Sequence, residues 1–198
     1  ANHSPWGIAY TAGGTGWVGE GWGANHLLAQ VVDGAVLGPT HSYTWNPFFG
    51  PADFTYNANT GKIWVMGVGD RSCIHEVDPD TGVTGVQICP SWSTSQRGLA
   101  FDPDTGTYFA GSWNDGQLHR FDASGAILET IATNLAIAGL AYNSATGHLF
   151  VMENYAPNLV FVLDVADQYR IIGGFPIAGF SAFGGAGLEI DCNGALWA

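Results

Sequence analysis

One sequence motif recurs along the chain: GLAFDPDTGTYFAGS at residues 98–112 aligns without gaps to GLAYNSATGHLFVME at residues 139–153. Related copies are DFTYNANTGKIWVMG from Asp53 and GLEIDCNGALWA from Gly187, and a more divergent copy, GIAYTAGGTGWVG, begins at Gly7. One equivalent apolar position in each copy, spaced by 46, 45, 41 and 48 residues, is held by Ile8, Phe54, Leu99, Leu140 and Leu188. This period matches one four-stranded propeller blade of about 40–50 residues.

Each copy predicts a β-hairpin, because two short apolar strands flank a turn of the form Asx-x-x-Thr-Gly. In residues 98–112 the side chain of Asp102 can accept a backbone N–H two residues on. Gly106 closes the turn at a position that needs a positive φ. A large side chain, which we expect to pack between blades, stands three residues after the glycine at Trp17, Trp64, Phe109, Phe150 and Trp197.

The sequence therefore predicts an all-β protein, a single β-propeller domain over residues 1–198 built from four-stranded antiparallel blades. A second hairpin follows the first in each repeat, and no segment shows helical periodicity. The expected blades cover approximately residues 6–50, 51–95, 96–137 and 138–185, with a partial blade at 186–198. We expect these four and a half blades to belong to a larger ring of six to eight blades, or to one that another chain completes, because two orphan strands expose an edge.

Composition excludes several classes of protein. Charged residues make up 11% of the chain, aromatic residues 13%, and there are 29 glycines. This composition is not that of a disordered or coiled-coil protein. Five basic residues against seventeen acidic ones give a net charge of -12, which disfavours nucleic acid and anionic membranes as partners. No apolar stretch reaches the roughly 18 residues of a membrane helix, so membrane insertion is not expected.

The cysteine spacing favours a disulfide bond. Cys73 and Cys89 flank a predicted hairpin centred on Thr81, which places them opposite each other across an antiparallel pair. The alternative is a pair of free buried thiols. A disulfide would indicate an extracellular or cell-surface protein. Zinc is disfavoured because no CxxC motif is present, and any partner of Cys192 lies elsewhere.

The two faces of the predicted propeller differ in character. The turns within hairpins are short and regular, whereas the connections on the opposite face, here called the aromatic loop face, are long and aromatic. Aromatic side chains among polar neighbours suit a carbohydrate or a protein partner. The alternative is that they fold back over the blade ends. The candidate binding residues are Trp22, Tyr43, Trp45, Phe48, Phe49, Trp92, Trp113, Tyr155 and Phe183.

No catalytic constellation is evident in the sequence. Neither GxSxG nor HExxH occurs, and the six histidines are scattered, so no catalytic residue is assigned. Glu153 and Asn154 end a predicted second strand near the aromatic loop face. Carboxylate and amide oxygens there could hold Ca²⁺ or Mg²⁺. They could equally be solvated loop residues.

The repeated pattern Leu-Ala-Phe/Tyr-Asx-x-x-Thr-Gly-x-aromatic resembles the NHL-like and lactonase-like β-propeller superfamily of secreted bacterial and archaeal proteins. The resemblance covers nearly the whole chain and implies the propeller fold. Similar members include gluconolactonase-type hydrolases, streptogramin-lyase-type enzymes and non-catalytic modules of secreted peptidases or surface layers. The resemblance implies for the enzymes a metal site of Glu, Asn and Asp around the channel, to which Glu153 and Asn154 are a partial match.

These observations favour a non-catalytic extracellular module for recognition or assembly, which binds a protein or carbohydrate through its aromatic loop face and needs no cofactor. One alternative is a metal-dependent hydrolase or lyase of the lactonase-like type. A second is a structural subunit of a surface layer or filament, in which self-association completes the partial blade.

Overall fold

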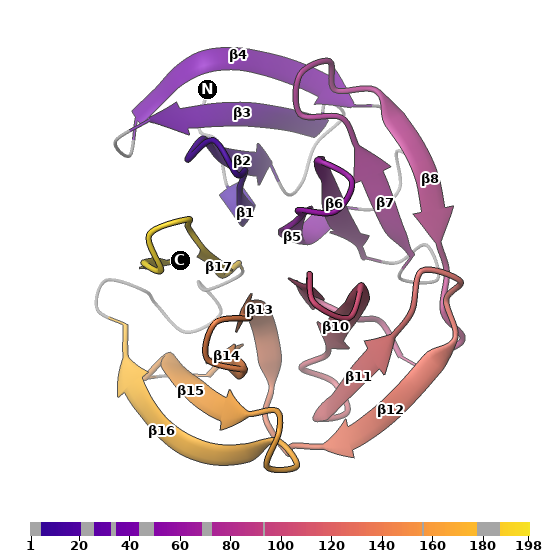
Figure 1. Cartoon of the computed structure of the whole chain (residues 1–198), viewed down its shortest axis with the longest axis vertical. Coiled ribbons are helices and arrows are strands. Elements are labelled where there is room, and N and C mark those ends of the chain that lie inside the picture. Colours follow the sequence, from indigo (N-terminus) through magenta and orange to yellow (C-terminus); the bar gives the residue numbers. More distant parts are fainter. Residues whose placement is uncertain are drawn as a thin grey trace.

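The computed structural model describes residues 5–20, 26–32, 35–43, 50–68, 73–92, 94–155, 157–177 and 187–198. In these ranges all the regular elements are β-strands, which form four four-stranded sheets and one two-stranded sheet. Figure 1 shows the sheets arranged radially around a central axis. The predicted all-β propeller with four-stranded antiparallel blades is confirmed.

Each sheet is a meander of consecutive antiparallel strands. The first contains β1 (Pro5–Tyr10), β2 (Gly16–Glu20), β3 (His26–Val32) and β4 (Ala35–Tyr43), and the second contains β5 (Pro51–Asn57), β6 (Lys62–Gly67), β7 (Ile74–Val77) and β8 (Thr84–Ile88). The third contains β9 (Gly98–Asp102), β10 (Thr107–Gly111), β11 (Gln117–Phe121) and β12 (Ile127–Ala132). The fourth contains β13 (Ile137–Asn143), β14 (His148–Glu153), β15 (Leu159–Asp164) and β16 (Arg170–Pro176), and the fifth only β17 (Glu189–Ile190) and β18 (Leu196–Trp197).

The first strand of every sheet lies beside the axis, and the fourth strand lies at the periphery (Figure 1). β17 contacts both β13 and β1, so five sheets surround the axis in the described part of the chain. The larger ring of six to eight blades stays a prediction. The predicted limits of the blades also stay a prediction; in the structure the first strand of the first sheet begins at Pro5 and that of the fourth at Ile137.

The inner hairpins form because each turn satisfies its own backbone groups. In the β5–β6 turn, Oδ1 of Asn57 accepts the N–H groups of Asn59 at 2.9 Å and Thr60 at 3.1 Å. Gly61 then adopts a φ of 72°, which is strained for residues with a side chain. The predicted turn chemistry is confirmed, and it fixes the register of the strands at the axis.

Apolar side chains between neighbouring sheets form the core. The predicted large residue of each repeat occupies this layer in the first three sheets, where Trp17, Trp64 and Phe109 are 4%, 4% and 0% exposed. Phe150 packs against the core of the fourth sheet. Trp197 departs from the prediction: it is 37% exposed and its ring stacks 5.2 Å from that of Tyr10. Among the described residues no third strand pairs with β18, so one side of the Trp197 ring is left exposed.

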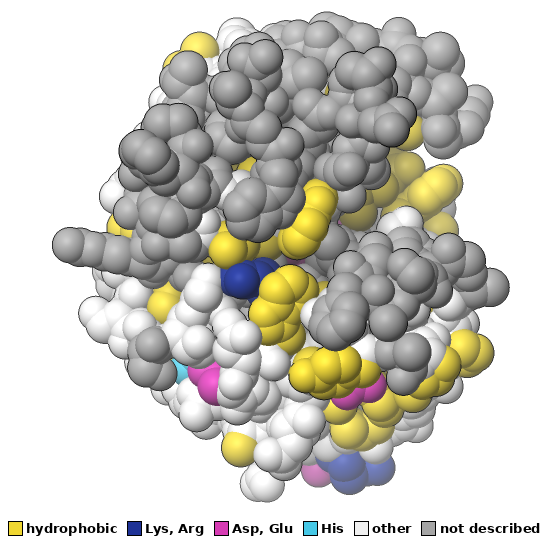
Figure 2. Space-filling view, turned by 180° about the vertical axis from the view of Figure 1, so that it is seen from behind, with side chains coloured by type: hydrophobic (Ala, Val, Ile, Leu, Met, Phe, Trp, Pro, Cys, Tyr) yellow, Lys and Arg dark blue, Asp and Glu magenta, His cyan; other side chains and the backbone are white. Residues whose placement is uncertain are grey.

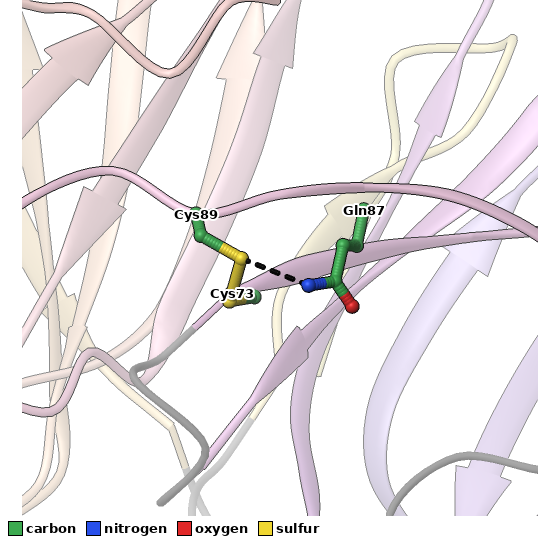
Figure 3. The surroundings of a disulfide bond; sticks show 3 residues. All are labelled: Cys73, Gln87 and Cys89. Carbon is green, nitrogen blue, oxygen red and sulfur yellow. Dashed lines mark hydrogen bonds between the residues drawn. A yellow bond between two sulfur atoms is a disulfide. The ribbon is translucent and has the colours of Figure 1, made fainter.

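The predicted disulfide between Cys73 and Cys89 is present, with an S–S length of 2.05 Å (Figure 3). It lies one step beyond the Ile74–Ile88 pair, so it clamps the open end of the β7–β8 hairpin. The Gln87 amide donates to Sγ of Cys89 at 3.2 Å. In the described ranges, no helix has the length and apolarity needed to cross a membrane.

Candidate functional site

The axis of the propeller opens at two ends. The turns between first and second strands surround one end, here called the turn face, which Figure 1 looks down on. The described connections of the other kind, such as residues 112–116 between β10 and β11 and residues 133–136 between β12 and β13, lie at the other end. That end is the aromatic loop face. Figure 2 views the molecule from this side, where hydrophobic side chains are visible at several places among the described residues.

Most candidate binding residues lie outside the described residues. These are Trp22, Trp45, Phe48, Phe49 and Phe183, and Tyr43 ends β4 with a side chain that is likewise outside the description. Trp92, Trp113 and Tyr155 are described, and their environments differ from one another.

Trp92 serves packing. Its ring lies edge-on to Phe121 at 5.3 Å and 5.8 Å from the ring of His119, against the core between the second and third sheets. His119 is itself buried, and its Nδ1 lies 3.0 Å from the hydroxyl of Thr130. Burial lowers the pKa of His119. In the structure Trp92 therefore folds back over the blade ends, which is the alternative interpretation given in the sequence analysis.

Trp113 is partly buried and lies against an arginine, whereas Tyr155 is exposed. The guanidinium of Arg97 lies 4.5 Å from the centre of the Trp113 ring, within the range of a cation–π interaction. Arg97 is held in place by its hydrogen bonds to the Ser95 hydroxyl at 2.6 Å and the Gln96 carbonyl at 3.0 Å. Burial lowers its pKa. Tyr155 is 53% exposed.

The two metal-ligand candidates lie at the end of β14. The Asn154 N–H donates to the Ala136 carbonyl at 2.8 Å, and the Asn154 side chain is 2% exposed with no hydrogen-bond partner for Oδ1. Glu153 is half-buried. Among the described residues no group of three or more His, Cys, Asp or Glu side chains could hold a metal ion. A metal site here stays a prediction.

A buried carboxylate occupies the middle of the axis. Asp53 is 0% exposed, and its carboxylate accepts three backbone N–H groups at 2.9 Å, from Phe54, Leu99 and Leu140. These donors belong to three different sheets, so the side chain ties β5, β9 and β13 together. A Cβ on Gly187 would lie 3.0 Å from Oδ1 of Asp53 and 2.7 Å from Cα of Gly7, which explains the glycine. Burial raises the pKa of Asp53 well above its usual range.

A second carboxylate lies nearer the turn face. Glu189 on β17 is 8% exposed, and its Oε2 accepts the N–H of Tyr56 across the axis at 3.3 Å. Oε1 accepts the N–H of Ile190 at 3.1 Å. Burial raises the pKa of Glu189 to about 8, although these two N–H groups and the Thr55 hydroxyl oppose the shift.

Sequence reasoning missed both carboxylates, although the repeat carries the signal. Asp53 stands where the other four copies have glycine, at Gly7, Gly98, Gly139 and Gly187. Glu189 stands where the other copies have a small residue, at Ala9, Thr55, Ala100 and Ala141. A charged residue that replaces a small one at an axial position of a repeat is the feature that would have identified them.

A pocket of about 500 Å³ opens at the turn face. Glu189 lies in its wall, together with Asp191, Cys192, Asn193 and Gly194 of the β17–β18 turn. One equivalent position in four first strands also contributes an aromatic side chain to the lining, at Tyr10, Tyr56, Phe101 and Tyr142. The repeat therefore places four aromatic side chains around this end of the axis.

The pocket is acidic. Of the described residues that line it, Glu189 and Asp191 carry carboxyl groups, and none is Lys, Arg or His. Asp191 accepts the Trp197 indole N–H at 3.0 Å and the Ala195 N–H at 2.9 Å, and these hydrogen bonds lower its pKa. Asp191 is therefore ionised at neutral pH at the mouth of the pocket.

Comparison with known proteins supports the fold. By sequence, no protein-family model and no curated protein matches the chain. By structure, it is similar to a protein of unknown function from Bacteroides caccae, with a TM-score of 0.67, 16% identity, and coverage of 97% of this chain and 69% of that one. It is also similar to streptogramin B lyase, with a TM-score of 0.62, 16% identity, and coverage of 98% and 61%.

A third similar structure is hydrazine synthase from Kuenenia stuttgartiensis, with a TM-score of 0.60, 14% identity, and coverage of 89% of this chain and 50% of that one. At these identities the likeness establishes the propeller fold alone. The chain spans between half and about two thirds of the length of these three proteins. Their functions differ, as expected of a fold that hosts many activities.

Proposed function

We propose that the chain is a non-catalytic extracellular binding module whose aromatic loop face recognises a protein or a glycan. The observation that carries the proposal is the Trp113 ring, which stacks on the Arg97 guanidinium at 4.5 Å, with Tyr155 53% exposed in the equivalent loop of the next sheet. Rigid aromatic side chains and arginine dominate binding energy in protein interfaces, and aromatic faces also stack on sugars. The Cys73–Cys89 disulfide and the acidic surface are compatible with an extracellular location.

Binding to a panel of soluble polysaccharides, measured by affinity electrophoresis, tests the glycan form of this proposal. Trp113→Ala and Tyr155→Ala should each weaken any binding by about tenfold or more, as at interface residues that dominate the affinity. Trp197→Ala is the matched control, because this exposed tryptophan lies on the turn face. Equal loss in all three variants would contradict a role for the aromatic loop face.

A metal-dependent hydrolase or lyase is the second candidate, favoured by one observation. Oδ1 of Asn154 is buried without a partner at the end of β14, next to Glu153, and buried oxygens of this kind suit a hard cation. Calorimetric titration with Ca²⁺ and Mg²⁺ separates this candidate from the first. Metal binding that Glu153→Gln abolishes would overturn the non-catalytic proposal. Equal, weak heats in both proteins would support it.

Assembly through the fifth sheet is the third candidate. Within the described residues this sheet has two strands where each of the others has four, and the neighbouring edge strand β16 exposes Ile171, Ile172 and Phe175. We propose that further strands cover this edge, either from additional blades of a larger NHL-like or lactonase-like ring or from a second subunit of a filament or surface layer. Light scattering across a dilution series distinguishes the two, because only the second gives a mass that depends on concentration.

A further inference from the structure

We propose that the pocket at the turn face is a binding site for a small organic ammonium ion, held by the Glu189 carboxylate and the surrounding aromatic side chains. The site lies at the opposite end of the axis from the aromatic loop face. It therefore does not depend on the function proposed above, and either proposal can fail without the other.

The first argument is the shape and composition of the pocket. Its volume of about 500 Å³ is that of a small-molecule site. The aromatic side chains of Tyr10, Tyr56 and Tyr142 come from three different sheets and converge on its lining. Aromatic faces attract cations within about 6 Å of the ring centre, and a ring of them is the usual cage for ammonium groups.

The second argument is charge. The pocket is lined by the carboxyl groups of Glu189 and Asp191 without a basic residue among its described lining, and the whole chain carries a net charge of -12. An anionic ligand would find no cationic partner there. A neutral sugar would leave the ionised Asp191 without a counter-charge, and Glu189 also above its pKa of about 8, whereas an ammonium ion uses both the charge and the rings.

The third argument is the spare capacity of Glu189. The Asp53 carboxylate is fully buried and accepts three N–H groups at 2.9 Å, so it is committed to the fold. Glu189 accepts two longer N–H bonds, at 3.3 and 3.1 Å, and a hydrogen bond from the Thr55 hydroxyl, and it lines the open pocket. A carboxylate offers about four acceptor positions, so Glu189 retains room for a cation.

Calorimetric titration with choline tests the proposal directly. The comparison ligand is the uncharged isostere of choline, in which a tert-butyl group replaces the trimethylammonium group. Choline should bind at least about tenfold more tightly than the isostere. Equal affinity of the two would overturn the proposal, because shape rather than charge would then govern binding, and so would displacement of choline by equimolar Ca²⁺.

Three variants locate the site. Glu189→Gln keeps the shape of the side chain and should weaken choline binding by about tenfold or more. Asp80→Asn makes the same acid-to-amide change at an exposed turn residue outside the pocket, and should leave the affinity unchanged. Tyr142→Leu removes one ring and should weaken binding about threefold. Equal effects of Glu189→Gln and Asp80→Asn would overturn the site.

Cys192 provides an independent readout that needs no variant. It is a free, exposed cysteine in the lining of the pocket. Saturating choline should slow its alkylation by iodoacetamide, and the isostere at the same concentration should not. Heat of choline binding with an unchanged alkylation rate would place the bound ion elsewhere and overturn the proposal.

The affinity should also depend on pH. Because burial raises the pKa of Glu189 to about 8, its charged form becomes dominant above that pH, and choline binding should strengthen from pH 6 to pH 9. The other ionisable groups beside the axis or the pocket are Asp53, Tyr10, Tyr56, Tyr142, Asp191 and Cys192. All of them remain in Glu189→Gln, so an equally steep pH dependence in that variant would overturn the role given to Glu189.

Discussion

The middle of the axis and its mouth at the turn face each carry one buried carboxylate, yet the two side chains have different consequences. Asp53 meets three short N–H bonds from three sheets, whereas Glu189 meets two longer ones and borders a pocket. The difference teaches that burial alone does not make a carboxylate part of a site. The place of the side chain decides: a carboxylate enclosed between sheets stabilises the fold, whereas one that borders a pocket remains available for a ligand.

The largest expected effect comes from removing the Asp53 carboxylate, whose hydrogen bonds join three sheets at the axis. Asp53→Ala leaves the N–H groups of Leu99 and Leu140 buried without their acceptor. At about 1–3 kcal/mol for each unsatisfied group, we expect a loss of about 3–5 kcal/mol in the free energy of unfolding. Urea denaturation measures it. A loss below about 1 kcal/mol would mean that water or a backbone shift satisfies these groups, and the contrast with Glu189 would disappear.

The disulfide at the periphery gives a second stability change with which the effect of Asp53→Ala can be compared. Cys73 and Cys89 are separated by 16 residues, and closing a loop of this size contributes about 3 kcal/mol by the chain-entropy model. The double variant Cys73→Ala/Cys89→Ala should therefore cost no more than Asp53→Ala in the same urea titration. A larger cost for the disulfide variant would show that the outer hairpin, rather than the axis, limits stability.

Repetition explains how much of the molecule the sequence predicts. The repeated apolar position held by Phe54, Leu99 and Leu140 identifies the inner strands. The symmetric placement of Cys73 and Cys89 about Thr81 identifies the disulfide. Both predictions succeed because they depend on local spacing. Local spacing says nothing about which residues meet across the axis.

Asp53 and Glu189 escaped prediction for this reason. Their partners lie 46, 87 and 133 residues away in the chain, and only the radial arrangement of the first strands brings these groups together. Trp92 illustrates the converse error. Its setting among polar residues resembles that of a binding residue, and only the three-dimensional structure shows that its ring packs against Phe121 beside the core.

The pH dependence of stability sharpens the comparison at the mouth of the axis. The folded pKa of Glu189, about 8, lies above the usual value near 4.5, so folding favours the protonated form. Its contribution to stability is complete below about pH 4.5 and is lost as the pH rises through 8, at a limit of about 1.4 kcal/mol per unit of pKa difference.

Thermal unfolding between pH 5 and 8 measures this effect. The melting temperature of the wild type should fall across this range, and Glu189→Gln should flatten the fall. Asp53, whose pKa burial also raises, acts in the same direction and leaves a residual slope in that variant. An unchanged slope in Glu189→Gln would contradict the burial of an acid at the pocket.

The smallest effect is expected from a carboxylate at the surface. The Lys62 ammonium pairs with Asp78 and lowers the pKa of Asp78 to about 2. This pair contributes stability above the usual pKa of an aspartate and loses it as the pH falls through 2, the opposite direction from Glu189. Because Lys62 is exposed to solvent and salt, Lys62→Met should shift the neutral-pH unfolding curve by little more than its measurement error. A shift as large as that of Asp53→Ala would mean that burial between sheets does not rank these carboxylates, since Asp78 lies near the surface and accepts the backbone N–H groups of Asp80 and Thr81 in its own turn.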